Sequence, residues 1–276
     1  MEARDDQPAV GTREHAMNAR RMRRGRGDPL EARWLVRRAD VLAARGAMRR
    51  ASHNGTSVIV HRRMLELHHY PGNASLTPHM LLEELGVPYA LKLVDRTRDA
   101  HKSPEYLRLN PNGLIPVLVA GDLVLYETAA ICLHLVDTHP QARLAPPVGT
   151  PERAHFYKWL AWLTNTLQAR LLAYFYPERW ADDPAAIAQV KARSEAAVGT
   201  MLDQLDAELV RHGGPWLLGT HYSAVDPYAL MVCRWTRGFT RPARSLPHLG
   251  PYLERVLERP AVKRTFEQEG LARPWV

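Results

Sequence analysis

Two stretches of the chain alternate between hydrophobic and polar positions. Leu65, Leu67 and His69 occupy every second position over five residues, which is the spacing of a β-strand. Residues 70–73, Tyr-Pro-Gly-Asn, have the composition of a turn, and residues 87–94 alternate a second time. The pattern therefore predicts two strands with a longer connection between them.

The connection between these strands has the spacing of a helix. Thr77 followed by Pro78 predicts the helix start, with Thr77 as N-cap and Pro78 at the first helical position. Gly86 predicts the end, because glycine adopts the left-handed conformation that closes many helices. A strand, a helix and a second strand in this order predict a parallel pair of strands. The apolar face of the helix is expected to consist of Met80, Leu81, Leu82 and Leu85.

A hairpin and a further helix follow along the chain. Residues 117–119 and 123–125 are apolar, and the Gly-Asp pair between them predicts a tight turn. Residues 127–137 then have helical spacing. The order βαβ followed by ββα indicates a small α/β domain that spans residues 64–139.

Everything beyond a proline-rich linker at residues 140–150 is predicted to be helical. Residues 151–276 contain two long stripes of residues spaced by three and four, as on the buried face of a helix. The segment from Ser223 to Asp226 is expected to form a capping box at the start of a third helix, with two shorter helices after it. We expect Asp226 to hold the fold together and not to act in catalysis. The two stripes are Phe156, Leu160, Leu163, Leu167 and Leu171, and Val190, Ser194, Val198, Met201, Leu205 and Leu209.

The net charge of +8 is concentrated at the beginning of the chain. Residues 1–63 contain 15 Arg, no Lys and 7 acidic residues, whereas basic and acidic residues are equal in number from Met64 onward. The folded part is therefore not expected to bind polyanions, and nucleic acid is not an expected partner. We expect residues 1–63 to be a disordered extension, or sequence that precedes the true start at Met64. An Arg-rich arm that binds RNA or a membrane is the alternative.

The cysteines and the hydropathy of the chain exclude several classes of protein. Cys132 and Cys233 lie in apolar helical patterns, so we expect buried free thiols and neither a metal site nor a CxxC redox pair. The sequence has no run of about 18 apolar residues, the length that a membrane-spanning helix needs. It also lacks the features of a secretory signal. We expect a cytoplasmic protein without a bound metal or a membrane partner.

The strongest chemical signal is a turn that leads into a strand through an Ile-Pro bond. Residues 110–113 are Asn-Pro-Asn-Gly, and Ile115-Pro116 stands just before the predicted hairpin. Where the next helix begins, Glu127 and Thr128 place a carboxylate beside a hydroxyl. Together these residues predict a pocket that offers main-chain hydrogen bonds to a peptide-like ligand and a polar, acidic site for an amino group. Taken singly, each has a structural interpretation: a trans proline at a strand start, and an acidic residue that favours a helix N-terminus.

These features, taken in order, resemble one known family. A βαβ-ββα domain with an Ile-Pro bond before its third strand, a Glu-Thr pair at its last helix and an all-helical domain behind it is similar to the cytosolic glutathione S-transferases. The bacterial-type members are the most similar, through residues 70–79, 110–113 and 223–226. The resemblance spans residues 64–270. It implies a thioredoxin-like glutathione-binding domain followed by an all-helical domain, with glutathione as co-substrate and a homodimer as the assembly.

The resemblance also implies roles for the residues that would hold glutathione. The proline of the Ile-Pro pair is cis in the family, so the main chain of Ile115, beside Pro116, would pair with the cysteinyl part of glutathione. Thr128 and the amides of its helix would bind the γ-glutamyl carboxylate, and Glu127 would bind the ammonium group.

The remaining implied contacts concern the sulfur and the glycyl end of glutathione. Ala74 stands where the bacterial cysteine-type members have their cysteine, so no disulfide with glutathione is expected there. Ser75 is the first expected donor to the thiolate, slightly ahead of Asn73, and both are expected to contact the sulfur. Lys102 or His101 would meet the glycyl carboxylate, with a solvated loop residue as the alternative.

The site of the second substrate is less specified by the sequence. The expected function is attack of the glutathione thiolate on a small apolar electrophile. A non-catalytic ligand-binding or regulatory module is one alternative, and a glutathione-dependent dehalogenase, lyase or isomerase is another. Polar residues of the long helix that correspond loosely to glutathione ligands of the cysteine-type members are Asn165 and Gln168. Aromatic residues that could line an apolar cleft, although core packing also explains them, are Trp159, Trp162, Tyr174 and Trp235.

Overall fold

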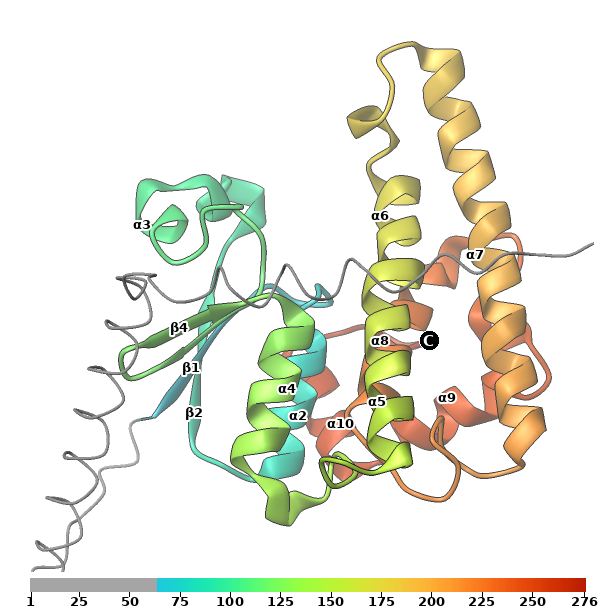
Figure 1. Ribbon diagram of the computed structural model, residues 1–276. Coiled ribbons are helices and arrows are strands. Elements are labelled where there is room, and N and C mark those ends of the chain that lie inside the picture. Colours follow the sequence, from blue (N-terminus) through green and yellow to red (C-terminus); the bar gives the residue numbers. More distant parts are fainter. Residues whose placement is uncertain (1–63) are drawn as a thin grey trace, which may run out of the picture. The chain divides into compact units, whose positions relative to one another are not determined.

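The computed structural model describes residues 64–276, and this part begins with a four-stranded sheet (Figure 1). The strand order is β2-β1-β3-β4, in which β1 pairs parallel with β2 and antiparallel with β3, and β3 pairs antiparallel with β4. The predicted parallel pair and the predicted hairpin are both confirmed. The predictions for residues 1–63 lie outside the described residues. The strands are β1 (Leu65–His69), β2 (Tyr89–Leu93), β3 (Val117–Ala120) and β4 (Leu123–Tyr126).

Helix α2 (Leu76–Leu85) begins one residue before the predicted N-cap. Thr77 is fully buried inside the helix, and its hydroxyl contacts Met231 Sδ at 3.2 Å in the helical part of the chain. The prediction of Thr77 as N-cap is therefore wrong, because its side chain is used for packing. Ser75 takes the N-cap position without a side-chain capping bond, and Gly86 closes the helix at φ 61° as predicted.

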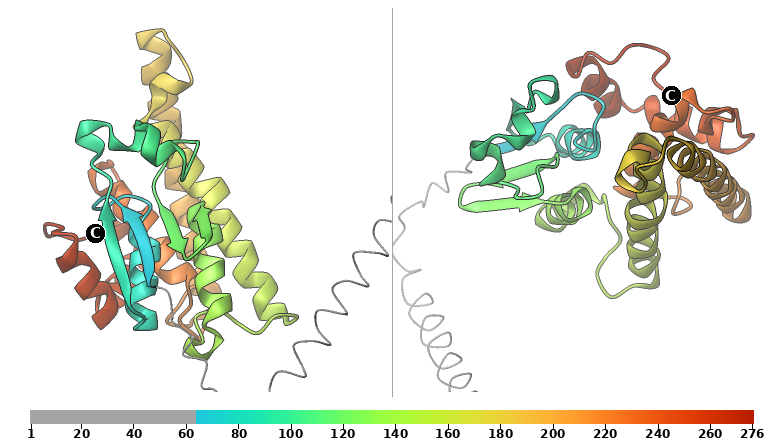
Figure 2. Two further views of the ribbon diagram at one scale, coloured as in Figure 1. Left: turned by 90° about the vertical axis from the view of Figure 1, so that its left-hand side faces the viewer. Right: turned by 90° about the horizontal axis from the view of Figure 1, so that it is seen from above.

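Two helices separate the sheet from the helical part of the protein. Helix α2 and helix α4 (Thr128–Thr138) pack against each other on one side of the sheet (Figures 1 and 2). The short helix α3 (Pro104–Leu107) begins at Ser103, whose hydroxyl accepts the Tyr106 N–H. The segment after α4 is the loop that leads into the helices of the second part.

The second part is built from helices only, within residues 139–276. The first apolar stripe forms a continuous helical run, but its middle six residues, Leu163–Gln168, are π-helical. The stripe alone predicts a plain α-helix, because a wider turn in its middle leaves the same residues buried. In the second stripe Leu202, and not Met201, is the buried residue. The helices are α5 (Pro151–Trp162), α6 (Ala169–Phe175), α7 (Pro184–His212), α8 (Val225–Arg234), α9 (Leu249–Leu257) and α10 (Pro260–Gln268).

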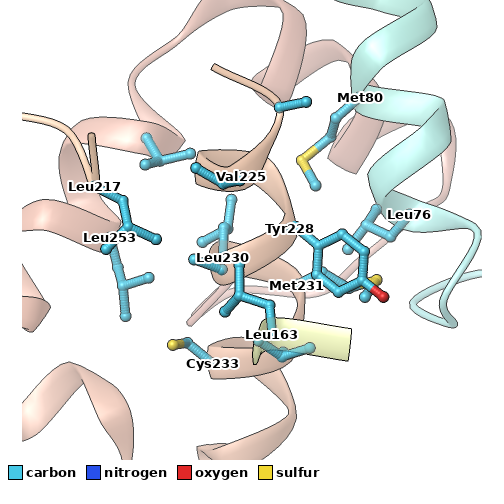
Figure 3. Close-up of a cluster of buried hydrophobic side chains, with 14 of the residues drawn as sticks. Leu76, Met80, Leu163, Leu217, Val225, Tyr228, Leu230, Met231, Cys233 and Leu253 are labelled. Carbon is cyan, nitrogen blue, oxygen red and sulfur yellow. The ribbon is translucent and has the colours of Figure 1, made fainter. Parts of the chain in front are cut away.

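Helix α8 is the centre of the core, and every one of its residues is buried. Its apolar side chains meet Leu76 and Met80 of α2 as well as Leu163 of the π-helical segment (Figure 3). A buried leucine or methionine contributes about 1.5–3 kcal/mol relative to an exposed one. The core therefore holds the sheet and the helices together as one body, and it fixes the start of α2.

Asp226 organises the N-terminus of α8 from within the core. Its carboxylate accepts the N–H of Leu217 at 2.9 Å, the N–H of Ser223 at 2.7 Å and the hydroxyl of Tyr252 at 2.9 Å. Burial raises the pKa of Asp226 to about 6, although these hydrogen bonds act in the opposite direction. The structural role predicted for Asp226 is confirmed.

The sequence prediction about membrane spans can be compared with the helices themselves. Within residues 64–276, no helix is both long enough and apolar enough to cross a bilayer.

Candidate active site

The strand register brings the three predicted site segments to one end of the sheet. His68 of β1 is opposite Val117 of β3, and Val117 is opposite Tyr126 of β4. The loop after β1, the residues before β3 and the residues after β4 therefore lie side by side at this end. Residues that are far apart in the sequence, from Tyr70 to Thr128, are thus brought together by strand pairing.

The loop between β1 and α2 contains the two predicted thiol donors, and they have different environments. Ser75 is fully buried, and its hydroxyl donates to Tyr70 O at 3.1 Å and accepts the Tyr70 N–H at 3.2 Å. A hydroxyl that closes this loop cannot also donate to a ligand, which argues against Ser75 as the principal donor. Asn73 is half-buried, and its Oδ1 accepts the Ala74 N–H at 2.7 Å. This contact leaves the Asn73 NH₂ group without an acceptor among the described residues.

The turn before β3 is held by the buried side chain of Asn110. Its amide nitrogen donates to Leu114 O at 2.7 Å, and its amide oxygen accepts the Asn112 N–H at 3.0 Å. Gly113 has φ 61°, and a Cβ there would lie 3.1 Å from a main-chain oxygen, so glycine is required. This network fixes the chain that enters Ile115.

The main chain of Ile115 is available for a ligand. The Ile115 side chain is buried, the Ile115–Pro116 peptide bond is cis, and the Ile115 N–H has no partner within residues 64–276. By contrast, the preceding carbonyl of Leu114 already accepts two donors, one of which is the Tyr106 hydroxyl at 2.7 Å. An unpaired amide at the end of a sheet can pair with an extended peptide as an added strand does.

Glu127 and Thr128 lie at the N-terminus of α4, directly after β4. Glu127 is exposed and has φ 73°, a conformation that is uncommon for residues with a Cβ and occurs often at functional sites. Thr128 is buried, and its hydroxyl has no hydrogen-bond partner in the described part of the chain. The hydroxyl and the first amides of α4 form a site with the polarity that an anion needs.

The basic residues predicted to meet the glycyl carboxylate differ in solvent exposure and in their existing partners. Lys102 is exposed, and its ammonium group lies 3.0 Å from Asp99. His101 is more enclosed, and burial lowers its pKa. Arg96 was not predicted: its guanidinium lies 6.0 Å from the Tyr70 ring and donates to the Tyr176 hydroxyl at 2.9 Å. The only sequence feature that could have pointed to Arg96 is its positive charge shortly after β2.

A second unpredicted feature is that both polar groups of the Gly72 peptide unit are bound from the helical part. The Gly72 N–H donates to Glu269 Oε2 at 2.7 Å, and the Gly72 carbonyl accepts the indole N–H of Trp235 at 3.0 Å. Glu269 also accepts a hydrogen bond from His79 Nδ1 at 2.8 Å inside the core. These contacts fix the loop that carries Asn73 to residues 163 and 197 positions after Gly72, which no local pattern could show.

The side chains around Glu269 are partly or fully buried, and several of them are basic. Burial, together with the nearby Arg237, lowers the pKa of Arg234 to about 10, while Glu269 acts in the opposite direction. Burial likewise lowers the pKa of His69. The charge of Glu269 thus lies among cationic or potentially cationic groups, beneath the loop and not at its surface.

Most of the aromatic and polar residues suggested for the second substrate lie elsewhere. Trp159 and Trp162 pack edge to face in a groove between α5 and α7, and Tyr174 packs against Phe239. Among the four aromatic candidates Trp235 is the one that contacts the loop before α2. Of the two polar candidates, Asn165 is exposed and Gln168 accepts the Tyr228 hydroxyl at 2.6 Å.

The described residues do not assemble the ligands of a metal site. No group of three or more His, Cys, Asp or Glu side chains between residues 64 and 276 is arranged to hold a metal ion. The polar groups at this end of the sheet are instead three kinds of donor, namely main-chain amides, the Thr128 hydroxyl and the Asn73 amide, and one acceptor, the Glu127 carboxylate. This set suits an extended peptide with a carboxylate, an ammonium group and an acceptor atom near Asn73.

Comparison with known proteins agrees with this geometry. Residues 74–138 match the N-terminal domain of glutathione S-transferases, and residues 163–260 match the C-terminal domain. The chain belongs to the glutathione S-transferase family. The predicted family and the predicted thioredoxin-like fold with a helical second domain are both confirmed.

Three similar proteins illustrate the relationship. Glutathione S-transferase GST-4.5 of Xanthomonas campestris is 29% identical over 207 residues, which cover 75% of this chain and all of the relative. A glutathione transferase homologue from Sulfitobacter, solved with bound glutathione, has a TM-score of 0.70 and 26% identity over 76% of this chain and all of its own. A glutathione S-transferase from Xylella fastidiosa has a TM-score of 0.69 and 31% identity, over 75% of this chain and all of its own.

Proposed function

We propose that the protein is a glutathione transferase that activates the thiol of glutathione for attack on a small apolar electrophile. The observation that carries this proposal is the unpaired Ile115 N–H beside the unpartnered Thr128 hydroxyl and the Asn73 amide. All three belong to one end of the sheet, where the strand register brings them together. Bound glutathione in the Sulfitobacter homologue supports the same ligand here.

The tripeptide would be recognised mainly through its main chain. Its cysteinyl N–H and C=O pair with Ile115 beside Pro116, and its γ-glutamyl carboxylate binds Thr128 and the first amides of α4. Glu127 is exposed at that helix start and binds the ammonium group. Lys102 stays our proposed partner for the glycyl carboxylate, and to reach it the ammonium group must leave Asp99.

The reaction requires the thiolate, whereas a free thiol has a pKa of about 8.5. The Asn73 NH₂ group and the N-terminus of α2 favour the anion, so the thiol proton leaves to water near neutral pH. The sulfur lone pair then forms a C–S bond to the electrophilic carbon. With a chlorinated nitroaromatic, the chlorine leaves as chloride with the bonding electron pair.

We further propose a cytoplasmic homodimer that serves in detoxification. The outer strand β4 supports association, because it exposes Leu123 and Val124 at the edge of the sheet. Size-exclusion chromatography with light scattering measures the assembly directly, and a monomer of 31.3 kDa contradicts this part of the proposal.

A glutathione-binding module without catalysis is the second candidate. The observation that favours it is the commitment of the Ser75 hydroxyl to Tyr70, which leaves the thiolate without a hydroxyl donor from this loop. A glutathione-dependent dehalogenase, lyase or isomerase would use the same thiolate with another substrate, and only a substrate panel separates these activities.

The test measures retention on a glutathione column and turnover of 1-chloro-2,4-dinitrobenzene for wild type, Asn73→Ala and Asn73→Asp. Loss of a charge-assisted hydrogen bond costs about 1–3 kcal/mol, so we expect kcat/KM to fall on the order of 10-fold to 100-fold in Asn73→Ala. Asn73→Asp keeps an acceptor for the Ala74 N–H but places a negative charge beside the thiolate, so we expect a larger loss.

The three possible results distinguish the candidates. Turnover in the wild type that falls in both variants, with retention unchanged, supports the transferase with Asn73 as donor. Retention of the wild type without turnover of any electrophile in a panel supports the binding module. If both variants turn over the substrate as fast as the wild type, Asn73 is not the thiolate donor.

A further inference from the structure

A buried guanidinium lies against the loop between β1 and α2, and no step of the proposed reaction involves it. Arg234 is the last residue of α8 and is 6% exposed. A Cβ at Gly72 would lie 3.5 Å from its Nη1, so the guanidinium is next to the residue that precedes Asn73. The neighbouring Trp235 binds the Gly72 carbonyl. The end of α8 therefore supports this loop and places a buried positive charge beside it.

The Arg234 guanidinium has no anionic partner within residues 64–276. It forms no ion pair and donates no hydrogen bond there, and its Nε is enclosed by protein. The Phe266 ring, whose centroid lies 5.7 Å from the guanidinium carbon, offers only a cation–π contact. A buried charge is costly unless it is paired, so the position of Arg234 favours an anion that these residues do not provide.

Glu269 is the acidic side chain whose charge acts on Arg234, but its carboxylate is already used. Its oxygens bind the Gly72 N–H at 2.7 Å and His79 Nδ1 at 2.8 Å. It attracts Arg234 through space without forming an ion pair with it. His69, at the end of β1, does not change this balance, because burial lowers the pKa of its ring and leaves it neutral near pH 7.

Two further arginines add to the positive charge. Arg237 is half-buried and donates from Nη1 to the Arg234 carbonyl at 2.6 Å. Burial lowers the pKa of Arg237, and the nearby charge of Arg244 acts in the same direction. Arg244 in turn donates to Val276 O at 3.0 Å. In the described part of the chain, Arg234 and Arg237 thus stand against one carboxylate, that of Glu269, which leaves positive charge in excess beneath the loop.

The excess charge and the reacting sulfur belong to the same loop. The proposed function places the sulfur beside the Asn73 NH₂ group and the N-terminus of α2. Asn73 directly follows Gly72, against which the Arg234 guanidinium lies. A cation next to a thiol lowers the thiol pKa, because it favours the negative form. The Ser75 hydroxyl cannot take this part, since it is bound to Tyr70.

We propose that Arg234 is the counter-charge of the glutathione thiolate and stabilises the reacting sulfur through space, from beneath the loop. The guanidinium itself does not touch the sulfur, which the Asn73 NH₂ group contacts. No bond of Arg234 forms or breaks, and the thiol proton still leaves to water. This inference rests on the proposed function, because it requires glutathione with its sulfur at Asn73.

The first measurement is the pKa of the bound thiol, read from the ultraviolet absorbance of the thiolate as the pH of the glutathione complex rises. We expect Arg234→Met to raise this pKa by about one unit, which is a tenfold smaller ratio of thiolate to thiol at a given pH. Methionine keeps an unbranched apolar side chain in the core. Arg234→Lys keeps the charge and should return the pKa most of the way to the wild-type value.

The second measurement separates an effect on the sulfur from damage to the loop. Calorimetry compares glutathione with S-methylglutathione, the same tripeptide without a thiol proton, at a pH between the pKa values of the bound and the free thiol. We expect Arg234→Met to weaken glutathione by up to about tenfold and to leave S-methylglutathione unchanged. A displaced loop would weaken both ligands equally.

Two further variants complete the design. Arg193→Met is the matched control, since Arg193 is an exposed arginine of α7 that forms no ion pair among the described residues. Its bound-thiol pKa and both affinities should equal those of the wild type. Arg234→Gln removes the charge but keeps a polar side chain, so it replaces Arg234→Met where that protein does not fold.

Two results overturn the inference while the proposed function stands. One is a bound-thiol pKa that Arg234→Met and Arg193→Met leave equally unchanged, which would make Arg234 only a counter-charge for Glu269. The other is equal weakening of glutathione and S-methylglutathione, which would assign Arg234 to the shape of the loop. A wild-type protein that binds neither ligand contradicts the proposed function itself, and the inference with it.

Discussion

Ser75 and Asn73 are two residues apart, yet their side chains have opposite tasks. The Ser75 hydroxyl closes the loop on Tyr70 in the core, whereas the Asn73 amide nitrogen is left for a ligand. The sequence prediction placed both donors in the loop between β1 and α2 and ranked Ser75 first. The ranking depended on hydroxyl chemistry, and burial, which the sequence does not give, decides whether that hydroxyl is available.

We expect Ser75→Ala to lower the free energy of unfolding by about 1–3 kcal/mol, because the half-buried Tyr70 N–H loses its acceptor. Chemical denaturation measures this. Ser194→Ala is the control: Ser194 is also buried, but its hydroxyl has no partner among the described residues, so its removal should be neutral or stabilising. Equal destabilisation by the two substitutions would contradict the role assigned to Ser75.

At the scale of elements, the end of α10 and the start of α2 share one buried contact through Glu269. Its two carboxylate oxygens serve the Gly72 N–H and His79 Nδ1. A glutamine offers one acceptor oxygen and one donor group, so it keeps both contacts only when His79 Nδ1 changes from donor to acceptor and the negative charge is lost. The candidate site therefore depends on a helix that contributes no ligand-binding residue to it.

We expect Glu269→Gln to lower the free energy of unfolding by about 1–3 kcal/mol and to lower kcat more than it raises KM, because the loop that bears Asn73 loosens. Denaturation and steady-state kinetics measure the two effects. Glu267→Gln changes an exposed neighbour by the same substitution and should match the wild type. A Glu269→Gln protein with normal kcat would contradict the claim that Glu269 positions the loop of the candidate site.

The N-terminus of α8 gives a pH dependence whose sign can be worked out. Because burial raises the pKa of Asp226 to about 6, the folded protein binds a proton that the unfolded chain, with a pKa of 3.8, releases. The Asp226 carboxyl therefore adds to the free energy of unfolding as the pH falls through 6. This contribution is complete below the pKa of the unfolded chain.

We expect Asp226→Asn to have a lower free energy of unfolding than the wild type. The difference in free energy between the two proteins should widen by roughly 2 kcal/mol from pH 7 to pH 4. Urea denaturation at several pH values measures this difference, in which the titration of other groups cancels. Asp182→Asn, at an exposed aspartate, should show a constant difference. A difference that narrows on acidification would contradict the raised pKa of Asp226.

At the scale of the whole molecule, local patterns predicted the elements and strand pairing linked them into a site. Ile115, Glu127 and Thr128 were predicted because the turn and the helix start that contain them are local in sequence. The contacts of Gly72 with Trp235 and Glu269 were not, because they join segments that meet only in the folded core. For the same reason the tryptophans of α5 could not be assigned to a groove or a cleft in advance.

The central claim is that glutathione lies extended along Ile115 with its sulfur at Asn73, and a crystal structure of the complex tests it most directly. We expect the cysteinyl main chain to pair with Ile115 and the sulfur to lie within hydrogen-bonding distance of Asn73 Nδ2. A glutathione molecule that binds elsewhere, or whose sulfur faces another donor while the Ile115 N–H remains unpaired, would contradict the account.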